Sequence, residues 1–128
     1  MELLVLVKAD APNVLEEVKQ LVLEADSDVN ARDHTMATAL HCAAQTGQED
    51  VLLFLIGKGA SVRAQDNKGH TPLHVAILSN QVATAALLVE FSLASDLLIK
   101  DINDKTPLDM AATTPAMNQV VALDRALD

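Results

Sequence analysis

The chain has 128 residues, half of them hydrophobic but only two aromatic (Phe54 and Phe91), so one domain with an aliphatic core is expected. This apolar composition excludes a disordered chain. Nine basic and eighteen acidic side chains give a formal charge of −9, which argues against nucleic acid and anionic membranes as partners.

The N-terminal apolar run 3–7 follows Glu2 and stops at Lys8. A signal peptide would begin with basic residues, so a buried terminal helix is the better interpretation. No segment reaches the ~18 to 20 apolar residues needed to cross a bilayer, and no membrane contact is expected. The single cysteine, Cys42, cannot form an internal disulfide, which favours the cytoplasm, with the nucleus as an alternative.

The chain repeats itself with an offset of 33 residues. The offset aligns Asp33 with Asp66, Thr38 with Thr71, Leu40 with Leu73, His41 with His74 and Ala43 with Ala76. A third copy starts at Asp101 with an offset of 35, and a partial copy precedes the others, because Val18 falls on Val51. Such periodicity predicts stacked structural units.

Each unit is predicted to contain a turn and two antiparallel helices. Gly69 can take the positive φ of a tight turn, Thr71 is a natural N-cap, and Pro72 suits the first position of a helix. That helix is expected to end near Asn80. A second helix, from about Gln81 to Phe91, is expected to bury its leucines, Leu87 and Leu88.

Two stretches carry a family resemblance: residues 66–76 read DNKGHTPLHVA, and residues 57–62 read GKGASV. They resemble the ankyrin repeat. The resemblance implies an all-α solenoid of helix-turn-helix units with short hairpin-like turns, forming a single domain over residues 1–128. The expected units are an N-terminal cap at 1–32, repeats at 33–65 and 66–100, and a C-terminal capping repeat at 101–128.

The chain departs from the ankyrin pattern at several turns and helix starts. Met36 and Asp104 stand where the motif has its turn glycine, and Ala39 replaces the proline. Those hairpin tips are therefore expected to be looser or differently shaped. Asp109 stands at the position of the motif's histidine, and a final helix is expected to start at Thr114-Pro115.

No motif of catalysis, cofactor binding or metal binding is found in the sequence. The resemblance implies that His41 and His74 tie their helix starts to neighbouring turns. Cys42 should point about 100° away from His41 on the helix, which argues against a nucleophile-base pair. His34 and His70 have no cysteine or carboxylate partner at zinc-site spacing. We expect a protein that is not an enzyme and needs no cofactor or metal.

The resemblance implies a protein partner held on the concave side, by hairpin tips and the exposed face of each first helix. The positions concerned are His34, Thr35, Ala37, Gln45, Thr46, Asn67, Lys68, His70, Leu78, Ser79, Ile102, Asn103 and Lys105, with Thr113 and Thr114 in the last unit. Leu78 and Ile102 are expected to form a small apolar spot flanked by the cationic side chains. The partner's identity is open, and the chain itself is expected to be a monomer.

The inserted stretch Ser92–Ile99 leaves an alternative open. We expect the last unit to bury Leu97, Leu98 and Ile99 in the core. If it does not, these residues form an exposed apolar surface through which a structural protein could self-assemble. An enzyme or regulatory subunit with an unrecognised site is a more distant alternative. The pair Val29-Asn30 also resembles the asparagine site that hydroxylases modify in some ankyrin proteins.

Overall fold

The computed structural model describes residues 14–23, 28–92 and 94–112. These residues form the helices α2 (Val14–Leu23), α3 (Ala39–Thr46), α4 (Glu49–Gly57), α5 (Pro72–Leu78), α6 (Val82–Glu90) and α7 (Pro107–Ala112), and the 3-10 helix η1 (Ala94–Leu98). No strand occurs in these ranges, and none of their helices is long and apolar enough to span a bilayer. The helices predicted at 3–7 and from Thr114-Pro115 lie outside the described residues, as do Thr113 and Thr114 as candidate binding positions.

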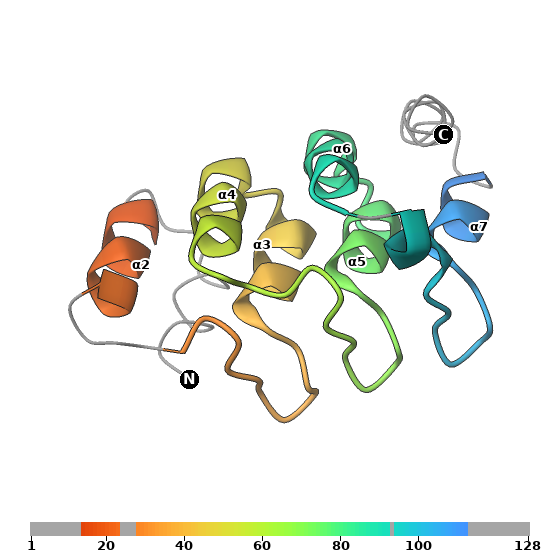
Figure 1. The fold of residues 1–128 in the computed structure, drawn as a ribbon, viewed down its shortest axis with the longest axis horizontal. Coiled ribbons are helices and arrows are strands. Elements are labelled where there is room, and N and C mark those ends of the chain that lie inside the picture. The colour runs from red at the N-terminus through yellow and green to blue at the C-terminus, as the bar shows by residue number, and fades with distance from the viewer. Residues whose placement is uncertain (1–13, 24–27, 93, 113–128) are drawn as a thin grey trace.

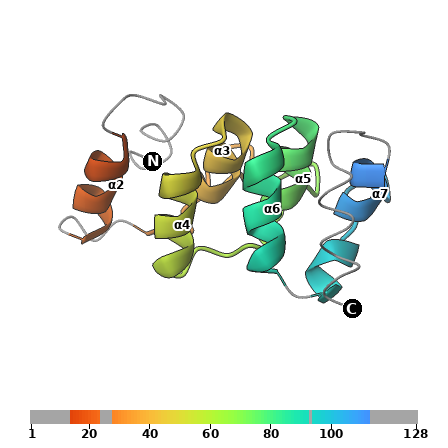
Figure 2. The same cartoon turned by 90° about the horizontal axis from the view of Figure 1, so that it is seen from above.

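The helices stack in two layers, as the ankyrin resemblance implies (Figures 1 and 2). In one layer α5 contacts both α3 and α7, and in the other α4 contacts both α2 and α6. The two layers are joined within each unit by the pairs α3–α4 and α5–α6. Three hairpin turns project together from the edge of the α3–α5–α7 layer (Figure 1). The prediction of an all-α solenoid is confirmed.

The first helices of the two full units begin in the same way. Thr38 and Thr71 are N-caps with extended backbones, and each amide donates to the Nδ1 atom of the histidine three residues later, at 3.2 and 3.1 Å. The threonine hydroxyl in turn accepts the histidine amide, which completes a capping box. Ala39 replaces proline without loss of this arrangement.

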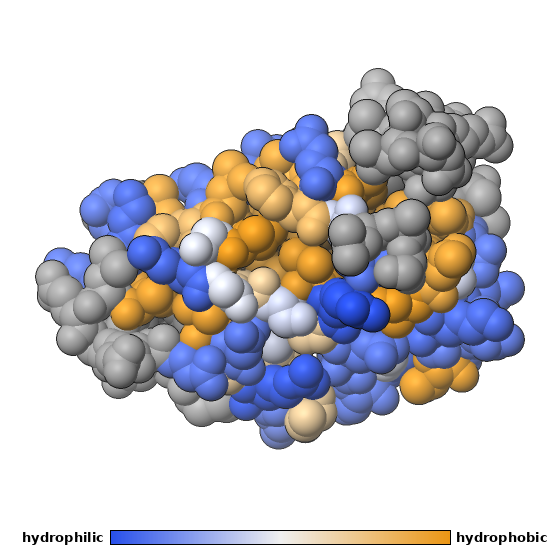
Figure 3. All heavy atoms as spheres, viewed as in Figure 1, coloured by the Kyte–Doolittle hydropathy of each residue, from blue (hydrophilic) through white to orange (hydrophobic). Residues whose placement is uncertain are grey.

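The core lies between the two helix layers and continues from unit to unit. Leu40, Leu52, Leu55 and Leu88 are completely buried there. Leu87, predicted to be buried with Leu88, is only partly buried. Figure 3 shows apolar side chains gathered over the helices, while the hairpin edge below them is mostly polar.

The inserted stretch forms η1, which packs against α7. Leu97 joins the core, but Leu98 is 62% exposed and Ile99 is partly exposed, so the prediction that all three are core is wrong for Leu98. A single helical turn carries consecutive side chains to different sides, which separates Leu97 from Leu98. The Nε atom of Arg63 lies 2.8 Å from the Oδ1 atom of Asp96, so η1 is also tied to the preceding unit.

Candidate functional site

Each hairpin turn is closed by the aspartate at its start. In the second hairpin (66–70), Oδ1 of Asp66 accepts hydrogen bonds from the amides of Lys68 and His70, at 2.9 and 3.0 Å. Asp33 and Asp101 make the corresponding bonds in the first hairpin (33–37) and the third hairpin (101–105). These carboxylates therefore hold the main chain that forms the tips.

The three tips share one backbone shape. Met36 and Asp104 both have φ 66°, close to the 76° of Gly69 at the equivalent position. In each hairpin the amide of this residue donates to the carbonyl of the initial aspartate, at 2.9 to 3.0 Å. The expectation of differently shaped tips is wrong, because the surrounding hydrogen bonds impose the left-handed conformation on residues other than glycine. The expectation of looser tips stays a prediction.

Main-chain and histidine hydrogen bonds connect consecutive hairpins. The amide of Asn67 donates to the carbonyl of Thr35 at 2.9 Å, and that of Ile102 donates to the carbonyl of Lys68 at 3.0 Å. The Nε2 atom of His41 donates to the carbonyl of His70 at 2.8 Å. Likewise, Nε2 of His74 donates to the carbonyl of Lys105 at 3.0 Å. These two imidazoles therefore connect each helix start to the next unit, as expected from the resemblance.

Both of these imidazoles are kept neutral by their surroundings. Burial lowers the pKa of His41 and of His74, and this effect outweighs the carbonyl hydrogen bonds, which raise it. The hydrogen bonds also require a neutral ring, because Nδ1 accepts a threonine amide while Nε2 donates to a carbonyl. The Nε2 atom of His41 is thus engaged and cannot serve as a base for Cys42.

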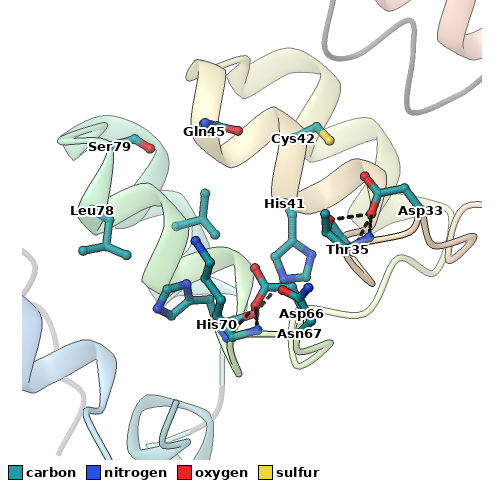
Figure 4. A pocket seen from close by; sticks show the side chains of 13 residues that line it. Asp33, Thr35, His41, Cys42, Gln45, Asp66, Asn67, His70, Leu78 and Ser79 are labelled. Atoms are coloured by element: carbon teal, nitrogen blue, oxygen red, sulfur yellow. Dashed lines mark hydrogen bonds between the residues drawn. The ribbon is translucent and has the colours of Figure 1, made fainter. Parts of the chain in front are cut away.

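A groove of about 420 Å³ lies between the first helices and the hairpins (Figure 4). Helices α3 and α5 form one side of it, and the first and second hairpins form the other. Eight of the predicted binding residues line it: Thr35, Ala37, Gln45, Asn67, Lys68, His70, Leu78 and Ser79. The groove therefore combines hydroxyl, carboxamide and ammonium groups with the 58% exposed side chain of Leu78.

The other five predicted binding residues, His34, Thr46, Ile102, Asn103 and Lys105, are not among those that line the groove. The Thr46 hydroxyl donates to the carbonyl of Cys42 at 3.0 Å and accepts a hydrogen bond from Gln48, so it is engaged within its own unit. His34, Ile102, Asn103 and Lys105 are exposed on the hairpins. Leu78 and Ile102 are both exposed, but only Leu78 faces the groove.

Sequence reasoning did not place five lining residues in the site: Asp33, His41, Cys42, Asp66 and Val75. The 33-residue offset already pairs Cys42 with Val75, and Cys42 precedes Gln45 by three residues on the same helix. Positions three residues apart share a helix face, so this spacing could have identified Cys42 and Val75. Asp33 and Asp66 were named only as an aligned pair of the 33-residue offset.

The structure also gives His70 a carboxylate partner from the following unit. Its Nε2 atom lies 3.2 Å from Oδ2 of the buried Asp101, and its ring centre lies 5.5 Å from that of His74. Burial alone would raise the pKa of Asp101, but the hydrogen bonds from the amides of Lys105 and Asn103 lower it overall. In the described part of the chain, no group of three or more side chains could hold a metal ion.

Comparison with known proteins supports one family. The sequence model of ankyrin repeats (3 copies) matches residues 5–101. Inversin of Canis lupus familiaris is 35% identical over 91 residues, which is 71% of this chain and 8% of that protein. The tyrosine-protein kinase HTK16 of Hydra vulgaris is 32% identical over 88% of this chain and 15% of its own length. The neurogenic locus notch homolog protein 1 of Homo sapiens is 34% identical over 80% of this chain and 4% of its own length.

The chain thus spans only a small part of each of these relatives. The family model covers most of the chain, and the helix pairs and hairpins described above have the corresponding arrangement. Ankyrin repeats are generally protein-interaction modules. The chain belongs to the ankyrin repeat family.

Proposed function

We propose that this chain is a non-catalytic protein-interaction module, acting as a scaffold, adaptor or regulatory binding unit. Its partner is a segment of another protein held in the groove between the first helices and the hairpins. The observation that carries this proposal is the exposed Leu78, surrounded by the polar side chains of the groove. Protein interfaces commonly have an apolar centre within a polar rim.

The size and construction of the groove support this proposal. Its volume of about 420 Å³ falls within the range of ~300 to 1,000 Å³ found for ligand sites. Its walls are fixed by the hydrogen bonds of Asp33 and Asp66 and by the capped helix starts. A rigid wall lowers the entropic cost of binding. The hairpin residues His34, Ile102, Asn103 and Lys105 extend the proposed contact surface beyond the groove.

The non-catalytic part of the proposal is supported by the neighbours of the only cysteine. Cys42 is buried, and the adjacent His41 uses Nε2 to hold the next hairpin. A cytoplasmic location, with the nucleus as the alternative, belongs to the same proposal, because one cysteine cannot form a disulfide within the chain.

The test compares two exposed leucines on different helices. Leu78 lies on the groove side of α5, whereas Leu53, 42% exposed, lies on α4 and does not line the groove. A partner captured with the wild type should bind Leu78→Ser about ten to a hundred times more weakly, as expected for losing a buried leucine. Leu53→Ser should bind unchanged, and both variants should keep a melting temperature within a few degrees. Equal binding by both variants would place the interface elsewhere.

Self-association is the second candidate, and it has a specific observation behind it. Leu98 of η1 is 62% exposed while its neighbour Leu97 is core. Analytical ultracentrifugation at several concentrations separates the two candidates. A constant monomer mass supports the interaction module, while a dimer that Leu98→Asp dissociates supports self-assembly.

A further inference from the structure

The contact between His70 and Asp101 joins two hairpins at the edge of the groove. Asp101 Oδ1 accepts the amides of Asn103 and Lys105, at 2.8 and 3.0 Å. Oδ2 is also buried, but among the described residues it accepts no hydrogen bond. The Nε2 atom of His70 lies 3.2 Å from it, without the geometry of a hydrogen bond. The contact is therefore chiefly electrostatic, and its strength depends on the charge of the imidazole.

A buried carboxylate oxygen without a hydrogen bond is costly unless a positive charge lies nearby. The ionisable group beside this oxygen is a histidine, His70, rather than an arginine or lysine, whose charge would be permanent near neutral pH. The lowered pKa of Asp101 keeps its carboxylate ionised in the range where imidazoles titrate. The partner of this carboxylate is an imidazole, the side-chain type that can gain or lose a proton near neutral pH.

Other ionisable groups lie around His70 on every neighbouring element. They are Asp66 and Lys68 on its own hairpin, Asp101 and Lys105 on the third hairpin, His74 on α5 and His41 on α3. His41 and His74 both use Nδ1 as an acceptor and Nε2 as a donor, which keeps them neutral. Asp66 Oδ1 is occupied by two amides of its own hairpin. Within this group, the imidazole of His70 is the one placed directly against a buried anion.

We propose that His70 and Asp101 form a proton-dependent clasp between the second and third hairpins. The imidazolium holds the buried carboxylate at mildly acidic pH, and the clasp weakens when the ring becomes neutral. The same two hairpins share the bond from the amide of Ile102 to the carbonyl of Lys68. Because Lys68 and His70 line the groove, the clasp fixes one wall of the groove and adds positive charge there.

A double-mutant cycle with His70→Gln and Asp101→Asn tests the clasp without a binding partner. The new asparagine keeps an oxygen for the amides of Asn103 and Lys105, so the hairpin retains its closure. Unfolding by urea is measured for the four proteins at about pH 5.5 and about pH 8. The coupling between the two side chains, expressed as a factor in the folding equilibrium constant, should be about tenfold larger at the lower pH, because only the protonated ring adds a Coulomb attraction. The separate effects of each substitution on His41 and His74 cancel in the cycle where they are additive.

The control cycle pairs His70→Gln with Asp104→Asn. Asp104 lies in the same hairpin but interacts with Lys100, 3.5 Å away, so its coupling to His70 should be small at both pH values. Equal coupling of His70 to Asp101 at both pH values would overturn the proposal. A coupling of His70 to Asp104 that changes with pH as much as the coupling to Asp101 would overturn it as well.

Amide exchange provides a second test if Asp101→Asn fails to fold. The protection factor of the Ile102 amide, relative to that in His70→Gln, should rise as the pH falls. A ratio independent of pH would overturn the clasp.

Discussion

Replacing Gly69 by alanine tests how closely the second and third hairpins approach. Gly69 has φ 76°, and a Cβ atom added there would lie 2.8 Å from Cα of Asp101 and 2.9 Å from N of Ile102. The left-handed conformation costs an alanine ~1 to 2 kcal/mol, and the stiffer unfolded chain returns ~0.4 to 1. The close main-chain contact forces a shift that costs ~1 kcal/mol more. We therefore expect Gly69→Ala to lower the free energy of unfolding by about 2 kcal/mol.

Two matched substitutions separate these contributions. Met36→Gly, at the equivalent position, relieves ~1 to 2 kcal/mol of left-handed strain. It loses ~0.5 to 1 kcal/mol through glycine flexibility and ~1 kcal/mol through the contacts that the 46% exposed side chain still makes. The net change should be below about 1 kcal/mol. Gly57→Ala, at the end of α4, meets nothing within 4 Å and should be neutral or stabilising by up to ~1 kcal/mol.

Urea denaturation followed by circular dichroism measures all three variants against the wild type. The expected order of stability places Gly69→Ala well below the other two. If Gly69→Ala is as stable as Met36→Gly, the main chains of the second and third hairpins are not in the close contact described.

The remaining predictions concern pH, packing and local stability. Burial lowers the pKa of His41 and His74 in the folded protein, so their contribution to stability is complete above about pH 6.5 and is lost as the pH falls through the lowered values. Urea titrations of His70→Gln, which lacks the opposing clasp, should show this fall, and a flat profile would contradict it. Leu88→Ala should cost about 2 to 5 kcal/mol in urea denaturation, against less than ~0.5 for the exposed Leu53→Ala, and similar losses would refute the assigned burial. Hydrogen exchange should protect α5 and α6 longest, because units lie on both sides of them, and faster exchange there than in α2 would oppose this.

The sequence predicted the all-α repeat fold well because the repeated residues act locally. Thr71 and His74 cap a helix within four residues of chain, and Asp66 closes its own turn. Such interactions depend on spacing along the chain, which the 33-residue offset displays directly. The positive φ at Met36 follows from the same alignment, since Gly69 stands at the equivalent position.

Contacts between units were harder to predict from the same pattern. His70 and Asp101 are 31 residues apart, and their meeting depends on how one unit is rotated against the next. Periodicity gives the order of the units but not that rotation. The different burial of Leu97 and Leu98 likewise depends on the two inserted residues, for which no other unit offers a template. Eight residues of the groove lining were among the predicted binding positions because those positions recur in the repeat, while the rest of the lining depends on packing.

The hydrogen bonds from His41 and His74 to the next hairpin end on main-chain carbonyls. The acceptor residues are His70 in one case and Lys105 in the other, two unlike side chains at corresponding positions. A bond to the main chain makes no demand on the side chain of the residue that receives it. These hydrogen bonds between units therefore tolerate substitution of the acceptor residues, His70 and Lys105. The side chains at the hairpin tips can therefore differ from unit to unit, or be redesigned, while the hydrogen bonds that align the units stay the same.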